Sequence, residues 1–175
     1  AHTSLVAGAL LSGIETVGEA MNDEVTYAFL NKCVKEEILP IIGENDESIS
    51  FANSVFDRFK NPYIQHKWRS IALNSVSKFA VRDLPTLLEY KEKNGKAPKG
   101  LTLALANLIY FYKNDNPDDN ADVVATMKND SISEILANTS LWSSDISDLT
   151  GIVTEYYNKI DTIGAKETMK WILSE

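Results

Sequence analysis

The chain has 175 residues, the size of one domain that can bury a core without disulfides or metals. Its composition is 44% hydrophobic and 24% charged, which excludes a disordered or collagen-like chain. With 25 acidic and 17 basic residues the net charge is −8, which argues against binding nucleic acid or an anionic membrane, because both require a basic surface.

Few residues suit disulfides or metals. The single cysteine, Cys33, excludes a disulfide framework and a cysteine-based zinc site, and its apolar neighbours favour a core position. His2 and His66 are the only histidines, so we expect no metal. No apolar run reaches the roughly 18 residues of a membrane span, and no signal peptide pattern opens the chain. We therefore expect a soluble cytoplasmic protein.

Helical spacing of apolar residues dominates the first half of the chain. It predicts an apolar helix over residues 5–11 and another over residues 25–38 that Pro40 closes. A further helix should begin near Asp46 or Ser48 and end before Pro62. Residues 64–80 are interpreted as one continuous helix.

The second half continues in the same way. Pro85 suits the first turn of a short helix, and residues 91–100, rich in Lys, Gly and Pro, predict a loop. Residues 101–112 are nearly all apolar and predict a central buried helix, followed by an acidic turn over residues 114–120 and helices near 146–160 and 169–173. No sustained alternation predicts strands. The expected fold class is mainly α, a single multi-helical domain over residues 1–175, with roughly eight to ten helices.

One segment reverses the acidic charge of the chain. Between its ends at residues 58 and 82 there are six basic residues and no acidic one: Arg58, Lys60, Lys67, Arg69, Lys78 and Arg82. The simple interpretation is a solvated basic face. On one helix, however, His66, Lys67, Ser70, Asn74, Ser77 and Lys78 would share an arc of about 120°. Their hydroxyl, amide, imidazole and ammonium groups suit a polyhydroxylated anionic small molecule.

Two further residues are candidates for a site. On that helix Arg69 would lie among apolar neighbours, where a guanidinium needs a carboxylate, backbone carbonyls or an anionic ligand. A structural salt bridge and a ligand contact are both open interpretations. His2 stands at the start of an apolar helix, whose dipole favours a neutral imidazole.

The block from Phe51 to Pro85 resembles the C-terminal domain of the mannitol dehydrogenase family, the polyol-specific long-chain dehydrogenases. The family pattern is carried by Arg58, Phe59, Asn61, Pro62, Ile64, Ser77, Lys78, Leu84 and Pro85. The opening Ala-His-Thr-Ser-Leu-Val of residues 1–6, with Gly13 after it, is similar to the tagaturonate reductase branch. Mannitol-type members usually have Gly-His-Ser or Gly-His-Ala there.

The resemblance implies a helical domain similar to the C-terminal domain of 6-phosphogluconate dehydrogenase. In the family an Asn-x-x-His element follows a catalytic Lys, and Ala1 and His2 resemble the end of that element. We therefore expect the Lys, the Asn and an N-terminal Rossmann domain to precede this chain. The spacing of Gly8, Gly13 and Gly18 does not match a dinucleotide-binding loop.

The resemblance also implies chemistry: NAD-dependent hydride transfer that interconverts D-tagaturonate and D-altronate, without a metal. His2 and the family's Asn would donate hydrogen bonds to the reacting oxygen, while the Lys shuttles the proton. Lys78 matches a position that holds substrate hydroxyls, whereas Arg69 is offset by one residue from another such position, which Ser70 occupies. Arg69, Lys78 and His66 are candidates to bind the substrate carboxylate. The 175 residues alone should be inactive.

Two alternatives remain open. The first is another dehydrogenase branch, such as mannitol 2-dehydrogenase or fructuronate reductase. The second is a helical interaction module without chemistry, in which Trp68, Trp142 and Trp171 would anchor a partner. Core packing is the simpler interpretation of three tryptophans in a helical domain.

Overall fold

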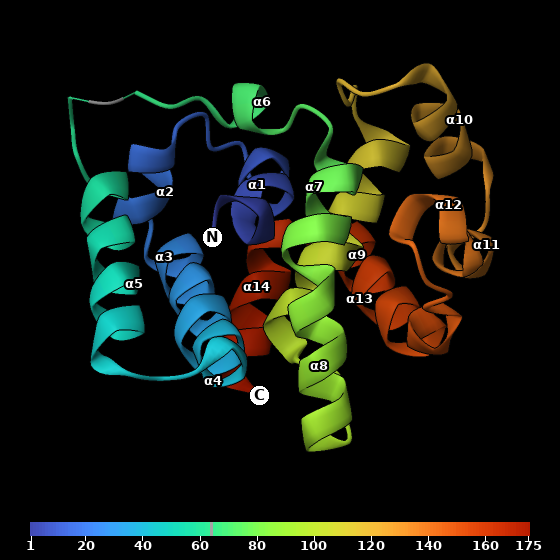
Figure 1. The fold of residues 1–175 in the computed structure, drawn as a ribbon. Helices are drawn as coiled ribbons and strands as arrows, with labels where there is room; N and C mark the ends of the chain where they lie inside the picture. Colours follow the sequence, from blue (N-terminus) through green and yellow to red (C-terminus); the bar gives the residue numbers. More distant parts are fainter. Residues whose placement is uncertain (64) are drawn as a thin grey trace.

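The computed structural model describes residues 1–63 and 65–175, so Ile64, which belongs to the resemblance quoted above, lies outside them. In this described part the chain forms helices throughout (Figure 1). They are α1 (His2–Leu11), α2 (Val17–Asn22), α3 (Glu24–Asn31), the π-helix η1 (Lys32–Ile38), α4 (Leu39–Ile42), α5 (Asp46–Phe59), α6 (Trp68–Ile71), α7 (Ser75–Arg82), α8 (Leu84–Asn94), α9 (Lys99–Asn114), α10 (Ala121–Asn129), α11 (Ile132–Ala137), α12 (Thr139–Trp142), the 3₁₀ turn η2 (Ser147–Leu149), α13 (Thr150–Ile163) and α14 (Ala165–Ser174).

The mainly α, single-domain fold is confirmed, but eight to ten helices was too low a number. Fourteen α-helices lie in the described residues, because short turns divide several of the expected ones. The only β feature found there is an isolated antiparallel bridge between Thr16 and Lys67. No described helix is both long enough and apolar enough to cross a bilayer.

The expected central helix is α9. Its residues from Gly100 to Ile109 are all buried, and it packs against α1, α10, α13 and α14. A helix that is apolar around its whole circumference must be covered on every side, which explains this position. Trp68 and Trp142 are also fully buried, so neither can anchor a partner at the surface, and Cys33 is a core residue as expected.

Pro40 does not close the helix that precedes it. The chain continues from α3 through the π-helix η1 into α4, and Pro40 lies in the first turn of α4. The run ends instead at Gly43, whose φ of 103° favours glycine. The π-helix turns Glu37 into the core, where it is 2% exposed.

Residues 64–80 do not form the single helix that we expected. The described part has α6, then a turn, then α7, and the break falls at Asn74, which is left-handed with φ 54°. The N–H of Asn74 donates to the carbonyl of Asp118, which holds the turn in place. The proposed polar arc is therefore wrong, because His66 and Lys67 precede α6 while Lys78 lies on α7.

The loop expected over residues 91–100 is shorter than predicted. Helix α8 continues to Asn94 and stops at Gly95 (φ 74°), and α9 already begins at Lys99. Pro85 does lie in the first turn of α8, and the acidic turn, α13 and α14 follow where the sequence predicts them.

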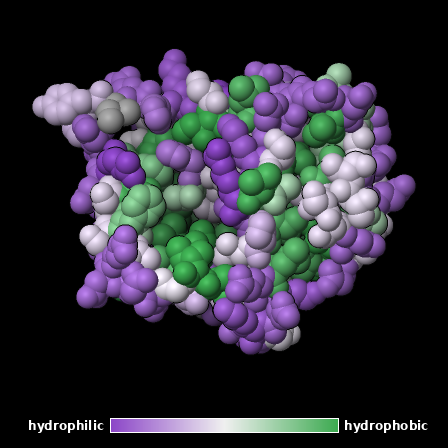
Figure 2. Space-filling view, in the orientation of Figure 1, coloured by the Kyte–Doolittle hydropathy of each residue, from purple (hydrophilic) through white to green (hydrophobic). Residues whose placement is uncertain are grey.

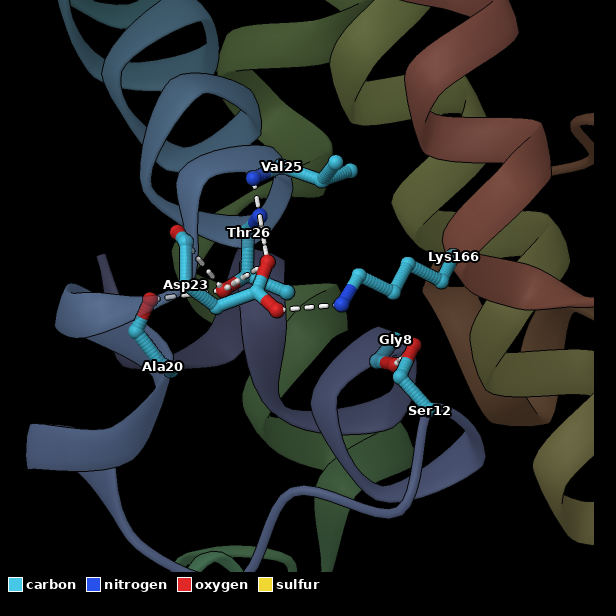
Figure 3. A network of polar contacts seen from close by, with 7 residues as sticks. All are labelled: Gly8, Ser12, Ala20, Asp23, Val25, Thr26 and Lys166. Atoms are coloured by element: carbon cyan, nitrogen blue, oxygen red, sulfur yellow. Dashed lines mark hydrogen bonds and ion pairs between the residues drawn. The ribbon is translucent and has the colours of Figure 1, made fainter.

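A polar network joins three parts of the fold (Figure 3). Asp23 Oδ1 accepts the N–H groups of Val25 and Thr26 at 3.0 Å and so caps α3. Asp23 Oδ2 pairs with Lys166 of α14, and the Thr26 hydroxyl donates to the carbonyl of Ala20 at 2.6 Å. Partial burial opposes the charged form, but these hydrogen bonds lower the pKa of Asp23 overall.

Candidate functional site

An apolar groove opens beside the first residues of the chain. It has a volume of about 530 Å³ and lies between α5 and the continuous run of η1 and α4. Figure 2 shows a hollow with hydrophobic side chains at this place, beside the amino terminus marked in Figure 1. Its apolar wall is formed by Val17, Val34, Ile38, Leu39, Ile42, Phe51, Ala52, Val55, Phe56 and Phe59.

The groove follows from the sequence of α5. This helix begins with a capping box at Asn45 and Ser48 and carries its apolar side chains on one face. Only Ala52 and Phe56 of that helix are buried, while Phe51 is 66% exposed. The apolar face of α5 is therefore only partly covered, and the uncovered remainder is one wall of the groove.

His2 lies at the polar end of the groove. Its ring stacks on Phe59 with 4.1 Å between ring centroids, and the rings of Trp68 and His66 follow at 6.0 and 6.2 Å. Its Nε2 atom is buried and has no hydrogen-bond partner in the part of the chain that the structure describes. A buried polar atom without a partner is unusual in a folded protein and makes His2 a candidate functional residue.

The imidazole of His2 is neutral at physiological pH. Burial lowers its pKa to about 4, and the positive charges of the amino terminus, His66, Arg82 and Arg58 act in the same direction. The sequence predicted a neutral ring from the helix dipole, whereas burial is the larger cause. A neutral imidazole has one N–H donor and one acceptor, so His2 can donate to a substrate oxygen without adding a charge.

Basic groups surround this end of the groove. Arg58 and His66 line it directly. Lys78 and Arg82 lie one turn apart on α7, and the positive charge of Arg82 contributes to the lowered pKa of His2. The ammonium of Lys78 donates to the carbonyl of Ile71 at 2.9 Å, which leaves two further N–H donors.

Arg69 lies elsewhere. Its guanidinium makes two hydrogen bonds to the carboxylate of Asp115, at 3.0 and 3.1 Å, and lies over the ring of Phe111. It contributes to a separate shallow cavity together with Lys67. The salt bridge, one of the two open interpretations, is thus the one observed, although the side chain is 54% exposed and does not lie in an apolar arc. Ser70 is exposed on α6, next to Arg69.

The structure therefore brings His2 and His66 together and separates them from Arg69. Arg58 and Phe59 line the groove although neither was predicted as a site residue, and both belong to the pattern that carries the resemblance. The four-residue spacing of Val55 and Phe59 on α5 was the signal that could have revealed the groove. Among the described residues no group of three or more His, Cys, Asp or Glu side chains is arranged to hold a metal ion.

Comparison with known sequences finds the same family as the resemblance described above. The pattern of the mannitol dehydrogenase C-terminal domain matches residues 1–164. Altronate oxidoreductase of Klebsiella pneumoniae is 38% identical over 183 residues, which cover 93% of this chain and 38% of that protein. Altronate oxidoreductase of Escherichia coli O7:K1 is also 38% identical, with 97% and 40% covered. The chain thus spans about two fifths of the length of these relatives.

Solved structures share the fold. A ternary complex of Pseudomonas fluorescens mannitol 2-dehydrogenase with NAD and D-mannitol superimposes with a TM-score of 0.87 at 22% identity, covering 99% of this chain and 38% of that one. D-sorbitol dehydrogenase in substrate-free form superimposes with a TM-score of 0.80 at 18% identity, covering 96% and 38%. In both, the matched part is a minor share of a longer chain.

Proposed function

The chain belongs to the mannitol dehydrogenase C-terminal domain family, and from this premise we propose that it is the substrate-side domain of an NAD-dependent oxidoreductase that interconverts D-tagaturonate and D-altronate. The observation that carries the proposal is the buried, neutral imidazole of His2, whose Nε2 atom has no partner in the described residues. The altronate oxidoreductases among the relatives support a sugar acid as the substrate.

The nucleotide site belongs to another part of the protein. The described residues contain no strand, so they lack the strand–turn–helix unit that holds a dinucleotide in a Rossmann domain. We assign no residue of this chain to NAD, and we propose that an N-terminal Rossmann domain binds it. NAD bound there supplies or accepts the hydride. The proposed reaction takes place in the cytoplasm.

His2 acts on the oxygen of the reacting carbon. When its Nε2 carries the proton, the imidazole donates a hydrogen bond to the carbonyl oxygen of the ketose, where negative charge develops during reduction. The stacked ring of Phe59 fixes the plane of the imidazole, so the donor does not have to reorganise during the reaction. Because His2 is already neutral, it does not compete with the basic groups nearby for the substrate carboxylate.

We assign the carboxylate of the sugar acid to the basic end of the groove. His66 and Arg58 line this end with an imidazole and a guanidinium, and Lys78 of α7, a position to which the resemblance assigns substrate hydroxyls, would supply an ammonium. Arg69, a candidate from the sequence, is now assigned to the ion pair with Asp115 and to no ligand. The apolar remainder of the groove does not suit a polyhydroxylated substrate, and we propose that the Rossmann domain covers it.

The experiment is an assay of the longer protein encoded by the gene. The coding sequence upstream of Ala1 should supply a Lys, an Asn two positions before Ala1 and a Gly-rich dinucleotide-binding unit. The purified protein should oxidise NADH with D-tagaturonate, and the 175 residues alone should not. Greater activity with D-fructuronate or with mannitol would assign the chain to another branch, and an upstream sequence without these features would refute the proposal.

A further inference from the structure

The start of α7 is held by residues from another part of the chain. The first N–H groups of a helix have no partner within it, and Asn74, at the N-cap position of α7, supplies no side-chain cap. Ser75 and Val76, the first two residues of α7, are each 2% exposed, so solvent does not reach them. Their N–H groups therefore need acceptors from elsewhere in the fold.

Tyr112 supplies one of these acceptors. It lies on the central helix α9, is fully buried, and accepts the N–H of Val76 with its hydroxyl oxygen at 3.4 Å. The same hydroxyl donates to Oδ2 of Asp119, in the acidic turn that follows α9, at 2.6 Å. Burial and the bond to Asp119 raise the pKa of Tyr112 above its ordinary value, so the hydroxyl keeps the proton that it donates.

The acidic turn reaches this place a second time. The carbonyl of Asp118 accepts the N–H of Asn74 at 3.0 Å. Two successive residues, Asp118 and Asp119, are thus bound to the corner between α6 and α7, one through the main chain and one through Tyr112. Figure 1 shows the segment between α9 and α10 beside the start of α7.

The corner determines where the ammonium of Lys78 lies. The main-chain N–H of Lys78 donates to the carbonyl of Asn74 at 3.2 Å, so the residue belongs to the first turn of α7. Its Nζ donates to the carbonyl of Ile71, the last residue of α6, at 2.9 Å. The side chain therefore spans the corner, and its position depends on how α6 and α7 are set relative to each other.

We propose that Tyr112 is a positioning residue for Lys78: its hydroxyl joins Asp119 to the start of α7 and so fixes the corner across which the Lys78 ammonium is held. In one respect this rests on the function proposed above, namely that Lys78 binds the sugar acid. The hydrogen bonds at the corner do not depend on that function, and they can be measured without activity.

The test is Tyr112→Phe in the longer protein, assayed with D-tagaturonate and NADH. The variant keeps the buried ring and removes the hydroxyl. A displaced ammonium weakens the ground state and the transition state alike, so the KM for D-tagaturonate should rise roughly five- to tenfold, while kcat and the KM for NADH stay within about twofold. Tyr110→Phe is the matched control, because its hydroxyl, on the same helix, donates to Asp161 of α13. It should change none of these constants.

A double variant shows whether Tyr112 acts through Lys78. Lys78→Ala should raise the KM for D-tagaturonate, and adding Tyr112→Phe should raise it no further, because the ammonium is already gone. An equal rise in both backgrounds overturns the proposal, as does an unchanged KM in Tyr112→Phe when Lys78→Ala raises it. If Lys78→Ala itself leaves the KM unchanged, the substrate role of Lys78 is wrong and the positioning role falls with it.

Two further measurements separate positioning from damage to the core. Asp119→Ala removes the acceptor from a partly exposed turn and should raise the KM for D-tagaturonate in the same direction. Amide hydrogen exchange, followed by mass spectrometry, should become faster around Val76 in Tyr112→Phe and stay as it is in Tyr110→Phe. An unchanged exchange rate at Val76 would overturn the proposal, since the hydroxyl would then not hold the start of α7.

Discussion

At the scale of single residues, the site depends on where water is excluded. His2 and His66 are 64 positions apart, yet their rings lie 6.2 Å from each other at one end of an apolar groove. Burial favours the neutral imidazole of His2, and its buried Nε2 has no hydrogen-bond partner among the described residues. Arg69, which the sequence also predicted as a site residue, forms an ion pair with Asp115 instead.

Replacing His2 tests its role in the reaction. In the longer enzyme, His2→Ala should lower kcat roughly 10²–10³-fold, because a hydrogen bond that strengthens in the transition state is lost. Steady-state kinetics with D-tagaturonate should show a much smaller change in KM. An equal loss in kcat for the control variant Arg69→Ala, which lies outside the groove, would show that the loss is not specific to His2.

Arg69 should behave as a structural residue. Its ion pair with Asp115 is half exposed, so Arg69→Ala should lower the free energy of unfolding by less than about 1 kcal/mol. The KM for the substrate should stay unchanged, whereas Lys78→Ala should raise it. If instead Arg69→Ala raises the substrate KM and leaves the KM for NADH unaffected, the assignment of the carboxylate site is wrong.

At the scale of elements, buried acids connect helices that are distant in sequence. Glu37 on η1 accepts the N–H groups of Gly100 and Leu101 at 2.8 Å each, so it caps the central helix α9 from another part of the chain. In the sequence Glu37 follows the charged residues Lys35 and Glu36 within the helix predicted over residues 25–38. Its burial follows from the π-helix, whose extra residue per turn shifts side chains around the axis, and apolar spacing does not reveal that.

Gly100 is needed for this contact. A Cβ at this position would lie 2.8 Å from both the sulfur of Cys33 and a carboxylate oxygen of Glu37. Gly100→Ala should therefore cost about 1–3 kcal/mol of unfolding free energy, measured by urea denaturation. Gly151→Ala in α13 meets no atom within 4 Å and should be neutral or stabilising by up to about 1 kcal/mol. Equal stability of the two variants would refute the close approach.

The network at Asp23 should make stability depend on pH. Because its folded pKa lies below the ordinary 3.8, the carboxylate stabilises the fold fully above that value and loses this contribution as the pH falls through the folded pKa. Asp23→Ala should cost about 1 kcal/mol at neutral pH, and the difference from the wild type should shrink in acid. If urea unfolding gives the same difference in unfolding free energy between wild type and variant at neutral pH and in acid, the charge of Asp23 plays no part.

At the scale of the whole molecule, the sequence predicts the helical class, the central helix and the family. Those features depend on local periodicity and on a motif around residues 51–85, both of which are present in one sequence. The break at Asn74 was missed because a tertiary contact, the hydrogen bond to Asp118, stabilises it. The groove was missed because it depends on how far α5 stands from η1 and α4, which no local pattern determines.

The central claim is that this domain selects a sugar acid by its carboxylate. The most direct measurement is the ratio of kcat/KM for D-tagaturonate to that for D-fructose, a ketose without a carboxylate, in the longer protein that we propose to be an NAD-dependent enzyme. A carboxylate held by Lys78, His66 and Arg58 should make this ratio roughly 100 or more, since charge-assisted hydrogen bonds contribute several kcal/mol. A ratio near one, or a preference for D-fructose, would contradict the account.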